Sequence, residues 1–139
     1  MFTSVTDKIS KRGFGYLTAS VIIAMAAWVY GMFSHGVHSL FMTYAFVIPL
    51  LAGAAPHIAS ALSIGADKGE NIRRILTDGT VCDAQLAIIA TLTAGSLLKG
   101  ALDIYGTTNR LLVAYPIMAV LVLAVPAAAA IKEKVRKSA

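Results

Sequence analysis

Four long apolar stretches, separated by short polar segments, make up most of this chain of 139 residues. They cover residues 14–33, 40–64, 84–105 and 111–131. A helix crosses the hydrocarbon of a bilayer, about 30 Å, with about 20 apolar residues, so each stretch is long enough for one span. Hydrophobic residues form 58% of the chain, more than a soluble domain of this length can bury. The pattern therefore predicts a single transmembrane domain over residues 1–139, embedded in the lipid bilayer.

The positions of the 12 basic residues predict the orientation of these spans. Most of them precede the first span, lie in the polar loop 65–83 or follow the last span, whereas Arg110 lies between the third and fourth spans. Lys and Arg concentrate in the cytoplasmic loops of membrane proteins. We therefore expect both termini and the loop 65–83 in the cytoplasm, and residues 34–39 and 105–110 outside. Residues 14–33 are interpreted as a retained span, because the apolar run is longer than that of a signal peptide.

The expected fold is all-α: an integral membrane four-helix bundle made of two antiparallel transmembrane hairpins. Small residues such as Gly95 and Gly100 recur in the spans and let helices approach closely in lipid. Pro49 and Pro56 are expected to kink the second span, because proline has no backbone N–H to donate. Asp83 is expected to cap the start of the third span, and Gly106 to end it.

Lys99 and Asp103 are two charges within an otherwise apolar span. Ionisable groups in a membrane segment are costly and need a partner. Asp103 lies near a helix C-terminus, where the helix dipole disfavours negative charge, so it should pair with a cation. We call the polar residues expected at this membrane face the outer cluster: His35, His38, Lys99, Asp103, Asn109 and Arg110. The cluster is predicted to bind a ligand or partner, or else to contain only an ion pair that lets the helix end at the interface.

The three histidines offer two further interpretations. His35 and His38, together with Asp103, have the residue types of a metal site, but an H-x-x-H spacing alone is a poor signal, and no metal is predicted. His38 and His57 are alternative ligands for haem b. Both belong to the second span, near its opposite ends, so ligation by two histidines would need a second protomer or another subunit. The favoured interpretation of His57 is an interfacial residue after the Pro56 kink.

Sequence motifs of catalytic machinery are missing from the chain. There is no Walker-type loop, no H-E-x-x-H, no G-x-S-x-G and no segment outside the spans large enough for a catalytic domain. The single cysteine, Cys82, excludes an internal disulfide and is interpreted as an unreactive interfacial residue. The protein is therefore predicted not to be an enzyme and to need no cofactor.

Two parts of the chain resemble known sequences. They are F-S-H-G-V-H-S through Y-A-F-V-I-P-L (33–50) and A-T-L-T-A-G-S through I-Y-G-T-T-N (90–109). These stretches look similar to a family of small membrane proteins of Gram-positive bacteria that has no assigned activity. The resemblance implies a four-span plan. It also points to the outer ends of the second and third spans, where the outer cluster lies.

The predicted function is that of a non-catalytic protein of the cell membrane. It would be an accessory or small transport subunit that works with other membrane subunits or as a homo-oligomer, with Lys99 and Asp103 at its binding site. One alternative is a redox membrane anchor that holds haem b or quinone through its histidines. Another is a small-molecule exporter that works as a dimer. Nucleic acid is not an expected partner, because the net charge of +5 comes from cations at the ends of apolar stretches.

Overall fold

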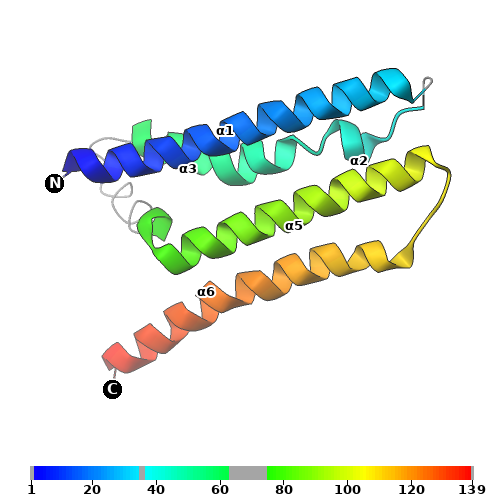
Figure 1. Cartoon of the computed structure of the whole chain (residues 1–139). Coiled ribbons are helices and arrows are strands. Elements are labelled where there is room, and N and C mark those ends of the chain that lie inside the picture. The colour runs from blue at the N-terminus through cyan, green and yellow to red at the C-terminus, as the bar shows by residue number, and fades with distance from the viewer. Residues whose placement is uncertain (1, 35–36, 63–74, 139) are drawn as a thin grey trace.

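The computed structural model describes residues 2–34, 37–62 and 75–138, and each regular element in these ranges is a helix. The predicted all-α class is thereby confirmed. The long helices are α1 (Phe2–Phe33), α5 (Gly79–Ile104) and α6 (Ala114–Ser138). The shorter helical pieces between residues 40 and 62 pack along α1 and α5 (Figure 1). The start of α1 and the end of α6 lie at the same end of the molecule.

Helix α1 extends over Phe2–Phe33, so it begins well before the predicted span 14–33. The basic segment ahead of the apolar stretch is therefore part of the same helix. Contacts with other elements explain the extension, since helices in proteins are stabilised mainly by packing. Ile9 is buried, and the Arg12 guanidinium contacts the carbonyl oxygen of Leu76 and the thiol of Cys82.

The predicted second span, 40–64, is not one continuous helix. It consists of α2 (Leu40–Thr43), the π-helix η1 (Pro49–Ala54) and α3 (Ala55–Leu62). Pro49 cannot donate to the carbonyl of Ala45, which instead accepts from Ile48 N at 3.3 Å in a tighter turn. The expected proline effect is therefore present, and it is stronger than a kink.

Helix α5 (Gly79–Ile104) begins earlier than the predicted span 84–105, and Asp83 is not its N-cap. Asp78 has the extended backbone of a cap, and its Oδ1 accepts from the amides of Thr80 (2.9 Å) and Val81 (3.2 Å). The predicted stop at Gly106 is correct. This glycine has φ +70°, and the amides of Gly106 and Thr107 donate back into the last turn, as in a Schellman motif.

The last part of the chain forms η2 (Arg110–Val113) and α6 (Ala114–Ser138). Helix α6 continues through Pro126 and beyond the predicted end of the fourth span at residue 131. The basic stretch that follows the apolar residues is therefore helical, like the one at the start of α1.

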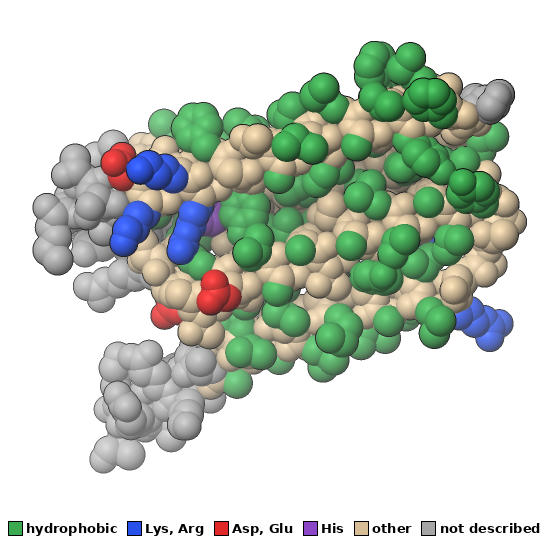
Figure 2. Space-filling model, in the orientation of Figure 1, with side chains coloured by type: hydrophobic (Ala, Val, Ile, Leu, Met, Phe, Trp, Pro, Cys, Tyr) green, Lys and Arg blue, Asp and Glu red, His purple; other side chains and the backbone are tan. Residues whose placement is uncertain are grey.

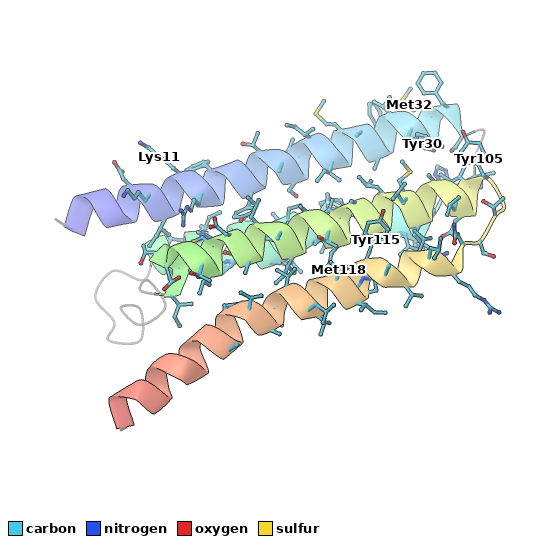
Figure 3. The ribbon with its side chains drawn as sticks, turned by 60° about the horizontal axis from the view of Figure 1, so that its bottom comes forward. Lys11, Tyr30, Met32, Tyr105, Tyr115 and Met118 are labelled. Carbon is cyan, nitrogen blue, oxygen red and sulfur yellow. The ribbon has the colours of Figure 1, made fainter. Side chains whose placement is uncertain are left out.

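Close helix contacts depend on three glycines, as the small-residue pattern predicts. A Cβ atom at Gly53 would lie 2.5 Å from the Tyr16 ring, and one at Gly100 would lie 2.5 Å from Cβ of Met42. At Gly95 a Cβ would lie 2.7 Å from Cβ of Tyr115, whose side chain points from α6 towards α5 (Figure 3). These glycines join α1 to η1, α5 to α2 and α5 to α6.

Many large apolar side chains are exposed between the two ends of the molecule. Figure 2 shows hydrophobic side chains over the middle of the visible face and charged ones towards its ends. Exposed apolar residues include Ile22, Met25, Trp28 and Met32 of α1 and Ile117, Val120, Leu121 and Leu123 of α6. Within the described residues, Asp7–Phe33 and Gly79–Ile104 are long and apolar enough to cross a membrane, while Pro49–Leu62 and Arg110–Pro126 are shorter apolar helices.

Candidate functional site

Lys99 and Asp103 form the predicted ion pair, one turn apart on α5. The hydroxyl of Ser39 donates to the other carboxylate oxygen of Asp103 at 3.1 Å. Ser39 occupies the N-cap position of α2 but makes no side-chain cap there, because its hydroxyl is used by Asp103. The carboxylate thus ties the end of α5 to the start of α2. The two charged side chains keep 35% and 27% of their exposure, so a ligand can reach both.

Lys99 of this ion pair lines a cavity of about 460 Å³, whereas Asp103 does not. Phe41 lies in its wall, 5.0 Å from Lys99 Nζ to the ring centroid, a distance at which a cation and an aromatic face attract each other. The polar lining residues gather at one part of the cavity: Ser96, Lys99, Thr108 and Asn109. The rest of the wall is mainly apolar and comes from the residue before η1 and from α5, η2 and α6: Ile48, Leu92, Leu112, Val113, Tyr115 and Pro116.

Asn109 and Arg110 follow the ion pair in the chain, but only Asn109 lines the cavity. The Asn109 side chain caps η2, with its Oδ1 accepting from Leu111 N at 2.9 Å. Its amide NH₂ group is therefore the part that can serve a ligand. Arg110 is exposed and makes no ion pair with another described residue.

The two histidines of the outer cluster do not join this site. His38 lies against Gly31 of α1 and lines a separate cavity of about 430 Å³ with Trp28 and Phe46. His35 lies outside the described residues. Among the described residues, no three His, Cys, Asp or Glu side chains are close enough to hold a metal ion.

His57 is fully buried within the protein. Its predicted place near the membrane interface stays a prediction. Its ring packs at a tilt of 48° against Tyr16 of α1, with 5.5 Å between centroids, and its Nδ1 lies 2.9 Å from the carbonyl oxygen of Gly53. It lines a cavity that His38 does not share. The pair His38 and His57 is therefore not arranged to hold one haem within a single copy of the chain.

Polar residues of α1 and α5 donate hydrogen bonds to backbone carbonyls of the second segment, residues 40–62. These hydrogen bonds were not predicted. Gln85 Nε2 donates to the carbonyl oxygen of Ala52 at 2.7 Å, and Ser96 Oγ donates to that of Phe41 at 2.7 Å. Ser20 of α1 donates to the carbonyl oxygen of Phe46 at 2.8 Å. The available signal was proline itself, since Pro56 leaves the Ala52 carbonyl without its usual helical donor.

Comparisons of the chain with protein families, with curated proteins and with solved structures find no match. The resemblance to small membrane proteins of Gram-positive bacteria therefore stays a prediction. Inferences about function depend on the geometry of the site alone.

The arrangement is chemically suited to binding. The ammonium group of Lys99 lines a mostly apolar cavity together with hydroxyl and amide groups, which matches a molecule with a polar head and an apolar body. Lys99 can donate to an anionic head, and Asn109 and Thr108 can add hydrogen bonds.

Proposed function

We propose that the protein is a multi-pass membrane protein with four membrane segments and both termini in the cytoplasm. The exposed apolar side chains of α1 and α6 support this proposal, because they need lipid or another protein against them. The basic residues near both ends of the chain favour the cytoplasmic side for those ends. The shorter apolar helices Pro49–Leu62 and Arg110–Pro126 belong to the second and fourth segments.

We further propose that it is a non-catalytic accessory or small transport subunit, acting in a complex or as a homo-oligomer, that binds an anionic amphiphile in the cavity beside Lys99. The observation that carries this proposal is the Lys99 side chain, paired with Asp103 and lining a cavity whose wall is mostly apolar. Lys99 lines the cavity but Asp103 and Arg110 do not, so the charge in the cavity wall is positive. A positive wall favours an anionic head group.

The binding test uses the purified full chain in a mild detergent with dihexanoyl phosphatidylglycerol as the probe, measured by native mass spectrometry. Lys99→Met removes the cation and keeps the length of the side chain. We expect this substitution to weaken binding about tenfold, the contribution of one hydrogen bond to a charged group.

Two further variants separate binding from folding. The double variant Lys99→Met with Asp103→Asn leaves no unpaired carboxylate and should bind as weakly as Lys99→Met alone. Lys8→Met removes a cation near the start of α1, which does not line the cavity. This variant should bind the lipid probe as tightly as the unmodified protein. Unchanged binding in both Lys99 variants would disprove the proposed site.

Small-molecule export is a second candidate, favoured by the polar residues along α5. Gln85, Thr93, Ser96 and Asp103 are distributed over the length of this helix, and Thr93 is buried. Such a row provides polar groups at several depths of the membrane, which an apolar span does not.

A further inference from the structure

A second polar pocket, of about 320 Å³, lies at the opposite end of the molecule from the Lys99 site. It is formed by α1, α3 and α5, and none of the outer cluster belongs to it. Its polar lining residues are Arg12, Tyr16, His57, Cys82, Asp83 and Gln85. Arg12 and Cys82 are already in contact with each other, while two other side chains present unused hydrogen-bonding atoms.

The first unused atom is Nε2 of His57. The Nδ1 atom of this ring lies 2.9 Å from the carbonyl oxygen of Gly53, and a carbonyl can only accept, so Nδ1 carries the proton. In the neutral ring Nε2 is then an acceptor. His57 is 0% exposed, and its Nε2 has no partner within the described part of the chain.

The second unused atom is Oε1 of Gln85. The amide NH₂ group of Gln85 donates to the carbonyl oxygen of Ala52 at 2.7 Å. This hydrogen bond orients the side-chain amide so that Oε1 points away from Ala52. Oε1 is buried and finds no donor among the residues that the structure describes. A buried acceptor without a donor is costly, and both His57 and Gln85 line the same pocket, which points to a ligand that donates hydrogen bonds.

The charges of the pocket narrow the chemistry of this ligand. Asp83 adds a carboxylate, which makes a third acceptor, and Arg12 adds a guanidinium that can take an anion. An ammonium group has three N–H donors, one for each of His57, Gln85 and Asp83. With about 30 Å³ per water-sized group, the cavity holds on the order of ten non-hydrogen atoms.

We propose that this pocket binds a primary ammonium group linked to a nearby phosphate, as in phosphoethanolamine. The ammonium donates to His57, Gln85 and Asp83, and the phosphate accepts from Arg12. The same chemistry occurs in the head group of phosphatidylethanolamine and in free phosphoethanolamine, and the experiment distinguishes these two sources.

The test titrates the full chain in detergent by calorimetry with dihexanoyl phosphatidylethanolamine and dihexanoyl phosphatidylcholine. The choline head keeps the charge and the phosphate but has no N–H donor. We expect the ethanolamine lipid to bind about tenfold more tightly, the effect of one charge-assisted hydrogen bond. Equal affinities for the two lipids would overturn the proposal. Free phosphoethanolamine then identifies the source: binding as tight as that of the lipid assigns a soluble ligand, and much weaker binding assigns the lipid.

A matched pair of variants tests the role of Gln85. Gln85→Met and Ser96→Ala each remove a hydrogen bond from α5 to the second segment, but only the first removes an acceptor from this pocket. We expect Gln85→Met to lose the preference for ethanolamine and Ser96→Ala to keep it. An unchanged preference in Gln85→Met would contradict the proposal. Lys99→Met should leave the preference unaltered, so this test is independent of the outer site.

Discussion

One carboxylate determines where α5 begins. Asp78 accepts hydrogen bonds from two amides of the first turn, which would otherwise have no partner within the helix. Asp83, five positions later in the sequence, is exposed and lies inside the helix. The two residues have the same chemistry and differ only in their place relative to the helix start, which makes them a matched pair.

Substitution of the two residues should have unequal effects on stability. Asp78→Ala should lower the free energy of unfolding by about 1 kcal/mol, because it removes a helix cap. Asp83→Ala should change it by less than about 0.5 kcal/mol, as is usual for exposed positions. Thermal unfolding followed by circular dichroism in detergent measures both. A larger loss for Asp83→Ala would mean that α5 starts later than Asp78.

Local sequence rules predicted some of these residues and could not predict others. The Lys99–Asp103 pair and the stop at Gly106 depend on neighbours within one turn, so sequence spacing was sufficient. Asp78 was not predicted as the cap, because the Asp-Gly pair that it forms with Gly79 is also typical of a turn. The burial of His57 and the separation of His38 from the ion pair depend on how α1 packs, which no local pattern contains.

The second segment is the least regular element, and its neighbours compensate for its irregularity. Backbone groups at membrane depth must be satisfied internally, and broken helices are tolerated only where protein covers them. The prolines of this segment were visible in the sequence, so disruption could be predicted. The residues that donate to its carbonyls could not be predicted, because Gln85 lies 33 residues from Ala52, whose carbonyl it satisfies.

A double-mutant cycle tests the link between Pro56 and Gln85. Gln85→Met should cost about 1 kcal/mol of stability, a typical value for a hydrogen bond between membrane helices. In a Pro56→Ala background, the backbone N–H of residue 56 can itself donate to the Ala52 carbonyl. Gln85→Met should then change the free energy of unfolding very little. Chemical unfolding in detergent gives the four stabilities. For comparison, Ser96→Ala combined with Pro56→Ala should be additive, and additivity of the Gln85 pair would refute the link.

At the level of the whole molecule, the chain has an apolar surface between two polar ends. Only two helices in the described residues are long and apolar enough to span a membrane by themselves. In the second apolar stretch, the single expected helix is replaced by α2, η1 and α3. Hydropathy alone predicted four spans, since it counts residues and does not register a break in the helix. The number of crossings and their direction are therefore proposals that need a direct test.

Cysteine labelling provides that test, since Cys82 is the only cysteine of the chain. In a Cys82→Ala background, Thr107→Cys should react with a membrane-impermeant maleimide on intact cells, because residue 107 follows the outer end of α5. Thr80→Cys, at the opposite end of the same helix, should react only after permeabilisation. The reverse pattern would invert the orientation, and labelling of both sites from outside would exclude α5 as a membrane span.

The hydrogen bonds from α5 to the second segment also have a consequence during biosynthesis, because the acceptors are made before the donors. The carbonyls of Phe41 and Ala52 are synthesised before Ser96 and Gln85, the side chains that satisfy them. During biosynthesis, the first half of the chain must therefore wait for α5, with those carbonyls in contact with water, the insertion machinery or a chaperone. A membrane-inserted fragment that ends at residue 62 should accordingly be a target for quality-control proteases, and supplying residues 75–139 as a separate chain should protect it.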